Sequence, residues 1–560
     1  MRWASVDPFL IADPFWQHKM GMPVANEQFV LALLRSGACH SYLFYCGDAG
    51  ADGYFRDRFA AQVPEAMERI RVLPRSLLPW GHERFPADVF HNGDFTYFMP
   101  YLIEWRNSLP VGRRFPVTGV THSLDTARLY AKFMQVLLAA PKPYDAIVCT
   151  SKAAVEMLSS SFQAIRDGFE RRLGGTPPEP PRLVHIPLGL PERAQPLPSR
   201  TEARRRLHFS EDEVVILSLG RLSPRTKMDL SPLLEGFAWL WEKVWRPSEM
   251  KVTLVLAGAG RRNDVELLYE LVRSLDLSRG VRVVPNVSRE EKDRLYAAAD
   301  LFCSLADNYQ ETFGLTLLEA MEAGLPILAT DFDGYRDLVV HGETGFLIPT
   351  WASCSHEPWE SLAGLLDPDQ LRYHLAQKVS FHMDLFLEFL SALVCRSDVR
   401  AAFAEKARKR AEEFRWPRVV QAYVGLWKDL IAMAARDRSM PAEPRSLIAP
   451  STGRIFRHYP SCILNESVPV MLGPYGRGRR SQDFRPTRYV ETACHLQDAV
   501  LDAMLEQTAF DPKTIGDLVK SGCTEYGLSR EMALLHVDWL IKHGMLTPEK
   551  TFNVPPRPCR

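Results

Sequence analysis

The sequence predicts an α/β protein with two facing, doubly wound (Rossmann-like) parallel-sheet domains, followed by a small C-terminal helical domain. The chain has 560 residues, which suits three or four domains, each large enough for its own core. Two long stretches alternate short apolar runs with amphipathic segments, the pattern of βα units in a parallel sheet. The polar, Pro-rich residues 174–182 and 191–200 come at the end of the first stretch and predict a linker before the second.

Each sheet domain is predicted from five apolar runs that are followed by helix-compatible residues. In the first domain the runs are 41–46, 87–92, 115–120, 144–151 and 182–189. In the second domain they are 214–220, 252–258, 281–286, 301–306 and 325–331. Two such domains in tandem place the carboxyl ends of their strands at a shared cleft, where we expect a ligand.

Changes of pattern along the chain predict the domain boundaries. Within the second sheet domain, an irregular insertion is expected at residues 351–385 and closing helices at residues 386–435. The four parts are the first sheet domain at 1–195, the second at 196–435, an Arg-rich linker at 436–490 and a helical module at 491–560.

The composition is that of an ordinary globular protein. Hydrophobic residues make up 46% and charged residues 24%, and 68 basic residues balance 68 acidic ones. This balance gives no overall attraction to nucleic acid or to anionic membranes. We also expect a cytoplasmic protein, because the sequence shows no signal peptide, no run of 18 apolar residues and no Cys-x-x-Cys pair among its ten cysteines.

Charge is distributed unevenly in the last part of the chain. Residues 436–490 hold ten arginines, no lysine and four acidic residues, whereas residues 491–560 hold ten acidic and seven basic residues. The tail predicts three short helices with a spacing similar to a winged helix, with Thr514 and Ser529 as N-caps. Its acidity argues against DNA binding, which needs an excess of cations. A peptide partner and a homodimer or packing contact are the two roles expected for it.

The most informative segment is residues 311–349. Glu311 and Glu319 enclose seven residues, and Gly314 precedes an amphipathic run that predicts a helix. The free N–H groups of a first helical turn, together with the helix dipole, favour an anion such as phosphate. Two carboxylates beside an anion site suit hydroxyl groups at the two ends of a nucleotide sugar. Taken alone, the spacing fits better the plainer interpretation of acidic residues that stabilise a helix N-terminus.

This segment resembles the signature of the GT-B glycosyltransferases of family 4, a large retaining family. The resemblance covers residues 200–430 closely and residues 1–190 loosely. Its elements are Glu311, Phe313-Gly314-Leu315, Glu319-Ala320-Met321, Gly324-Leu325-Pro326, the Gly-x-x-Gly-x-Leu run at 342–347, and Gly220-Arg221-Leu222 with Lys227 upstream.

The resemblance implies a binding site for a nucleotide-diphosphate sugar, the donor. Arg221 and Lys227 would hold the diphosphate and stabilise the charge that develops on the leaving group. Glu319 would hold the ribose hydroxyls, and Glu311 a hydroxyl of the transferred sugar. The further donor-binding residues implied are Phe313, Gly314, Leu315 and Thr316, with the main chain of residues 285–287 expected at the base.

From the first domain the resemblance implies His122 and Gly21. His122 ends a predicted strand and would be catalytic together with Arg221, Lys227 and Glu311, facing the sugar. Gly21 would lie near the diphosphate, but Met22 follows it where the family often has a second glycine. The shape of that loop therefore departs from the family pattern.

No metal or other cofactor is expected, because the cationic residues would already neutralise the diphosphate. Two Asp-x-Asp triplets have the form of a divalent-metal motif of a different glycosyltransferase fold. We interpret both as background: Asp331-Phe332-Asp333 and Asp367-Pro368-Asp369.

The predicted function is therefore a metal-independent, retaining glycosyltransferase of the hexosyltransferase type. The acceptor is open: a glycan, a lipid, a small molecule, or a peptide or protein. The expected mechanism is a same-face displacement in which the leaving phosphate helps to deprotonate the acceptor. The alternatives are a non-catalytic binding protein of the same fold, a sugar-nucleotide epimerase, or a phosphorylase, whose pyridoxal-binding lysine has no candidate in the sequence.

Overall fold

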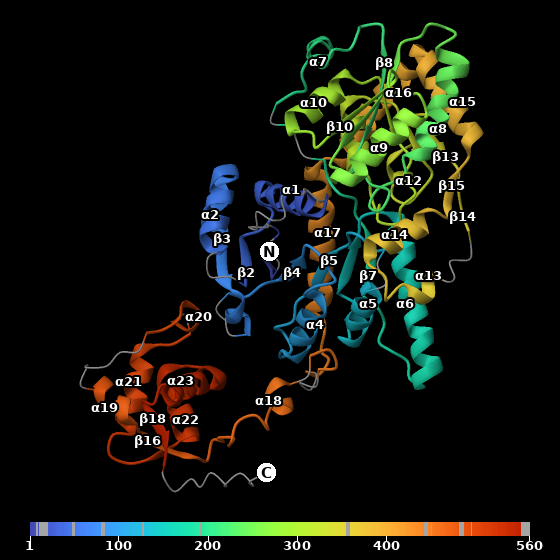
Figure 1. Ribbon diagram of the computed structural model, residues 1–560. Coiled ribbons are helices and arrows are strands. Elements are labelled where there is room, and N and C mark those ends of the chain that lie inside the picture. Colours follow the sequence, from blue (N-terminus) through green and yellow to red (C-terminus); the bar gives the residue numbers. More distant parts are fainter. Residues whose placement is uncertain are drawn as a thin grey trace.

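The computed structural model describes the chain except for residues 7–8, 10–20, 48–50, 80–84, 126–127, 191–192, 194, 354–358, 442–445, 450, 481–486, 494 and 550–560. The predicted linkers, insertion and tail fall partly outside the described residues. Two parallel-sheet domains and a smaller C-terminal module make up the described part (Figure 1). The predicted fold class is confirmed.

The first sheet has seven strands in the order β3-β2-β1-β4-β5-β6-β7, and its neighbouring strands are parallel. All residues of β4, β5 and β6 are buried, as expected where helices cover both faces of a sheet. Strands β1 and β3 are not predicted from the sequence, although other strands of similar length are predicted. The strands are β1 (Arg2–Ser5), β2 (Ser41–Cys46), β3 (Ile70–Pro74), β4 (Val89–Asn92), β5 (Val117–Val120), β6 (Ala146–Cys149) and β7 (Arg182–His185).

Five longer helices accompany this sheet: α1 (Gly21–Ser36), α2 (Ala51–Gln62), α4 (Met99–Ser108), α5 (Arg128–Leu138) and α6 (Lys152–Leu173). The domain contains a fully buried ion pair between Arg106 of α4 and Asp145, with an Nη2–Oδ2 distance of 2.6 Å. Burial lowers the pKa of Arg106, but the carboxylate of Asp145 more than reverses this effect.

The second sheet has six parallel strands in the order β10-β9-β8-β11-β12-β13. Helices α10 and α11 share a core with one face of the sheet, and helices α8 and α9 with the other. The strands are β8 (Val214–Leu219), β9 (Val252–Gly258), β10 (Val281–Pro285), β11 (Leu301–Ser304), β12 (Ile327–Thr330) and β13 (Gly345–Ile348). The helices are α7 (Arg200–Leu207), α8 (Ser231–Leu240), α9 (Arg262–Ser274), α10 (Arg289–Ala298), α11 (Leu315–Ala323) and α12 (Tyr335–Leu338).

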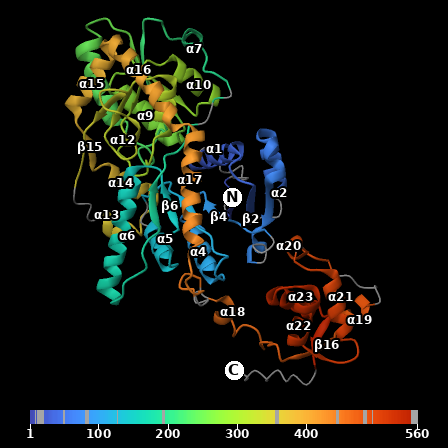
Figure 2. The ribbon, with the colours of Figure 1, turned by 180° about the vertical axis from the view of Figure 1, so that it is seen from behind.

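The predicted insertion contains an antiparallel pair, β14 (Thr350–Ala352) and β15 (Val379–Phe381), with α13 (Trp359–Leu362) and α14 (Pro368–Ala376) between them. Helices α15 (Met383–Cys395), α16 (Ser397–Ala411) and α17 (Trp416–Ala434) follow. Figures 1 and 2 show α17 alongside α1. Its side chains join the core of the first domain, because an aromatic cluster around Trp3 covers one side of α17. The last of the expected closing helices therefore packs on the first domain.

The C-terminal module has its own hydrophobic core and a three-stranded antiparallel sheet in the order β17-β16-β18. Thr514 and Ser529 cap the second and third of the predicted helices, as expected. Strand β16 lies inside the stretch expected to be a linker, so part of that stretch belongs to the module. The elements are β16 (Pro469–Leu472), α19 (Pro474–Arg480), α21 (Asp498–Gln507), β17 (Lys513–Thr514), α22 (Ile515–Tyr526), α23 (Arg530–Lys542) and β18 (Leu546–Pro548).

The Arg-rich stretch is bound to the acidic tail. The buried guanidinium of Arg479 contacts Asp498 at 2.6 Å and Asp502 at 2.7 Å. The module also contacts the first domain, where His495 lies 3.1 Å from the hydroxyl of Ser76. Of the helices that the structure describes, none has the length and apolar character needed to cross a membrane.

Candidate active site

The sequence-predicted donor residues gather at the carboxyl ends of β8 and β11. These two strands are neighbours in the second sheet, and the strand order reverses between them. Ligands of doubly wound sheets bind at such a switch point. The loop after β8 carries Arg221 and Lys227, and the loop after β11 carries Glu311.

Helix α11 begins at the position that the motif predicts, with Gly314 as its N-cap at φ 109° and no side-chain cap. A Cβ at this position would lie 2.8 Å from the ring of Tyr335, so both the backbone angle and the available space require glycine. The buried Oγ1 of Thr316, in the first turn, has no hydrogen-bond partner among the described residues. An uncapped helix terminus with an unpaired hydroxyl suits a phosphate oxygen as ligand.

Lys227 and Glu311 form a direct ion pair between Nζ and Oε2. Both are shielded from water, with side-chain exposures of 8% and 13%. Burial alone would raise the pKa of Glu311, but the ammonium of Lys227 reverses this effect and holds the pKa below its ordinary value. For Lys227 burial acts to lower the pKa, and Glu311 more than reverses it, so the pKa is raised. Both groups are therefore charged at neutral pH.

Arg221 lies on the same loop and is half-buried. Burial lowers its pKa, while the nearby charge of Glu311 acts in the opposite direction. Because a guanidinium stays protonated in proteins, Arg221 adds a second cation beside the pair. Two cations and a helix N-terminus thus surround one region at the switch point.

Glu319 lies in the second turn of α11 and is held by two side chains of α10. Its Oε1 accepts a hydrogen bond from Lys292 Nζ at 2.7 Å, and its Oε2 accepts one from the hydroxyl of Tyr296 at 2.9 Å. The carboxylate is partly exposed, at 26%. It is therefore held in place yet reachable by a ligand. The expected role at the ribose stays a prediction.

The two Asp-x-Asp triplets have structural partners. Asp331 pairs with Arg336 at 2.9 Å, Asp367 caps α14, and Asp369 pairs with Arg372 at 2.9 Å. Asp333 is different: it adopts a left-handed backbone with φ 45°, and its pKa is raised to about 8 by burial and by the charge of Glu311. Within the described ranges, no three His, Cys, Asp or Glu side chains are grouped so that they could hold a metal ion.

The two site residues predicted from the first domain are His122 and Gly21. His122 follows β5, and its Nε2 donates a hydrogen bond to the carbonyl of Gly93 at 2.6 Å. Burial lowers the pKa of His122, opposed by the carboxylate of Asp94. Gly21 is the first residue of α1, and Asn26 of that helix also donates to the Gly93 carbonyl, at 3.2 Å. Among the described residues, no hydrogen bond or ion pair joins His122 to the second domain.

Sequence reasoning missed the contacts that connect the two domains. Arg372 of the insertion forms an ion pair with Asp125, three residues after His122, with a second contact from Nη2 to Oδ1 of 3.2 Å. The backbone N–H of Lys152, the first residue of α6, donates to Asp337 of α12 at 2.7 Å. No sequence motif marks these residues, because each pair meets only in the folded chain.

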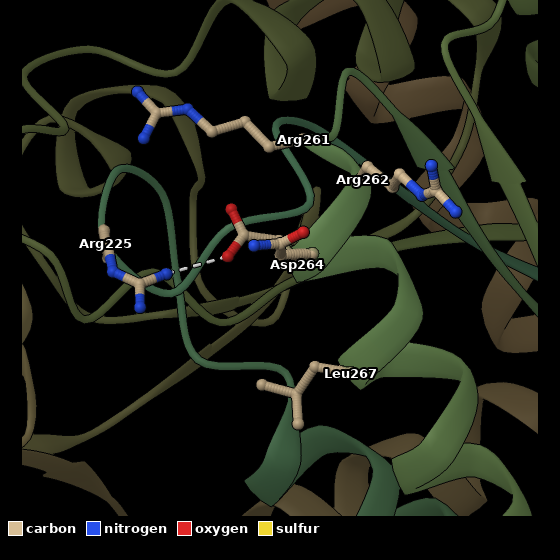
Figure 3. Close-up of a pocket in the computed structure, with 6 residues that line it drawn as sticks. Arg225, Arg261, Arg262, Asp264 and Leu267 are labelled. Atoms are coloured by element: carbon tan, nitrogen blue, oxygen red, sulfur yellow. Dashed lines mark hydrogen bonds and ion pairs between the residues drawn. The ribbon is translucent and has the colours of Figure 1, made fainter.

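A basic pocket of about 470 Å³ adjoins the loop after β8 that carries Arg221 and Lys227. It lies between the loop after β8 and the start of α9, and Figure 3 shows Arg225 reaching toward Asp264. Their Nη1–Oδ1 distance is 2.8 Å. The pocket is lined by Arg225, Arg261, Arg262, Asn263, Asp264 and Leu267.

Two parallel-sheet domains, with charged residues at the switch point of the second, define the GT-B class of protein. Residues 199–355 match the family described as "Glycosyl transferases group 1". This match lies within the second sheet domain. The predicted function class, glycosyltransferase, is confirmed at this level.

Individual relatives agree with this class. The D-inositol 3-phosphate glycosyltransferase of Kineococcus radiotolerans is 28% identical over 345 residues, which are 58% of this chain and 69% of that protein. The protein of the same name from Thermobispora bispora is 31% identical over 230 residues, 37% of this chain and 51% of that protein. The crystal structure of a glycosyltransferase from Rickettsia africae shares the fold, with a TM-score of 0.50 and 14% identity over 77% of this chain and 98% of that one.

Proposed function

We propose that this protein transfers a sugar from a nucleotide-diphosphate sugar to an acceptor hydroxyl, with retention of configuration and without a metal ion. The observation that carries the proposal is the buried Lys227–Glu311 pair beside the N-terminus of α11. A buried charge pair is costly to keep unless it serves the fold or a ligand. Here the ammonium and the uncapped helix terminus both favour a diphosphate.

Each group would act on a separate part of the donor. Lys227, Arg221 and the first turn of α11 would bind the diphosphate and stabilise the negative charge that develops as the glycosidic bond breaks. Glu311, ionised and buried, would accept a hydrogen bond from a hydroxyl of the transferred sugar. Glu319 would accept hydrogen bonds from the ribose hydroxyls, since α10 holds it in place and one side remains open to solvent.

Proton transfer and stereochemistry follow from the same arrangement. The leaving phosphate, held on the face that the acceptor attacks, would take the proton of the acceptor hydroxyl. This same-face displacement retains the anomeric configuration and needs no carboxylate nucleophile. His122 would face the sugar from the first domain, and its uncharged ring is already oriented by the carbonyl of Gly93.

The test is a donor-hydrolysis assay over a panel of nucleotide sugars, with Lys227→Met as the variant. Lys251→Met is the matched control, because Lys251 forms an exposed surface pair with Asp212. We expect turnover of at least one donor, insensitive to chelator, strongly reduced in Lys227→Met and unchanged in Lys251→Met. If the unmodified protein neither turned over nor bound any nucleotide sugar, the result would indicate a non-catalytic protein of the same fold. An inverted anomer in the product, seen by NMR, would refute retention.

A further inference from the structure

Tyr335, the first residue of α12, contacts three parts of the candidate donor site. It is fully buried at the end of the loop after β12. Its hydroxyl accepts a hydrogen bond from Lys227 Nζ at 3.0 Å and lies 2.8 Å from Ser304 Oγ at the end of β11. Its ring packs so closely against Gly314 that a Cβ there would lie 2.8 Å from it. No motif named from the sequence includes Tyr335.

The hydroxyl of Tyr335 accepts one of the three hydrogen bonds that the ammonium of Lys227 can donate. An ammonium group has three N–H donors. In the described structure one of them contacts Glu311 and one contacts the Tyr335 hydroxyl, which leaves the third for a ligand oxygen. Nζ also lies 5.5 Å from the centroid of the Tyr335 ring, within the range of a cation–π contact.

A lysine at this place needs such a partner. Its four-carbon chain is flexible, and a lone carboxylate would leave the ammonium free to turn about a single contact. Two acceptors on different loops, Glu311 after β11 and Tyr335 after β12, fix the direction of the third N–H. Because Tyr335 accepts from Lys227, its own O–H is free to donate to Ser304, which orients the hydroxyl in turn.

We propose that Tyr335 is a positioning residue that holds the ammonium of Lys227 toward the donor diphosphate, with Ser304 orienting its hydroxyl. The inference rests on the proposed function, because it assumes that Lys227 binds the diphosphate. A purely structural Tyr335 would act through its ring alone. The ring is retained in Tyr335→Phe, so this variant separates the two roles.

The first measurement compares Tyr335→Phe with the unmodified protein and with Tyr45→Phe. Tyr45 is a matched control, since it is a buried tyrosine of the first domain whose hydroxyl has no partner among the described residues. We expect Tyr335→Phe to lower kcat/KM for the donor and to weaken nucleoside-diphosphate binding about tenfold, the effect of one hydrogen bond to a charged group. Ser304→Ala should act in the same direction but less, and Tyr45→Phe should have no effect.

The second measurement is a double-mutant cycle with Lys227→Met, read by nucleoside-diphosphate binding. If Tyr335 acts through Lys227, then Tyr335→Phe has no further effect once the ammonium is gone. Additive losses, or Tyr335→Phe indistinguishable from the unmodified protein, would overturn the inference alone. An unmodified protein that neither binds nor turns over any nucleotide sugar would instead overturn the proposed function and, with it, this inference.

Discussion

Replacing Lys227 by methionine tests whether the buried pair serves the fold, the donor or both. Methionine keeps much of the volume of the side chain and removes the ammonium. Glu311 then stays buried and loses the contact that holds its pKa below the ordinary value. The variant therefore changes stability and activity through one atom, Nζ.

The expected magnitudes follow from the burial of the pair. Removing one partner of a buried ion pair costs about 3–5 kcal/mol of unfolding free energy, a large share of the roughly 5–15 kcal/mol of a typical protein. Loss of one preorganised cation at the developing charge should lower kcat by about 100-fold to 1000-fold. The control Lys251→Met removes an exposed pair with Asp212, which water and salt screen, so little change in stability is expected.

The contribution of Glu311 to the pH dependence of stability should have opposite signs in the unmodified protein and in Lys227→Met. In the unmodified protein the pKa of Glu311 is lowered, so its contribution to stability is present above the ordinary glutamate pKa and is lost as the pH falls through the lowered value. In Lys227→Met burial dominates and raises that pKa, so the contribution is largest at low pH and is lost as the pH rises.

Urea unfolding at pH 5 and pH 8, followed by circular dichroism, measures this difference, and donor hydrolysis measures the activity. We expect the stability difference between Lys227→Met and the unmodified protein to shrink at pH 5. Equal pH dependence in both proteins would refute the assignment of a charged, buried Glu311. Unchanged turnover would remove Lys227 from the donor site.

Three further predictions concern ion pairs outside the donor site. Arg372→Met removes the pair with Asp125 between the domains and leaves that buried carboxylate without Arg372, so donor kcat/KM should fall severalfold and urea stability should fall as well; unchanged kinetics would contradict a role at the cleft. Arg106→Met leaves Asp145 buried and unpaired and should cost about 3–5 kcal/mol in urea unfolding, a loss that a solvated pair would not show. Arg479→Met should speed hydrogen exchange in the C-terminal module only; exchange that changes across the sheet domains would contradict a locally folded module.

The sequence predicted most of the strands, including four-residue strands such as β5 and β6. Strand β8, with six apolar or small residues in a row, matches its predicted run closely, whereas β1 was missed although it lies inside its sheet, between β2 and β4. A central strand is specified by neighbours on both sides, and these come from β2 and β4, far along the chain. Likewise β16 could not be told from a linker, because its partners are β17 and β18.

The candidate donor site was predictable to the extent that it is local in the sequence. The glycine that caps α11 and the cations after β8 follow the ends of recognisable strands, so a motif could mark them. Their partners could not be read in this way, because Lys227 meets Glu311 across 84 residues and Tyr335 across 108. The pair of Arg372 with Asp125 spans 247 residues and two domains. In the sequence, Tyr335 is marked only by its place directly after Asp331-Phe332-Asp333-Gly334. Only the fold brings it into contact with Lys227.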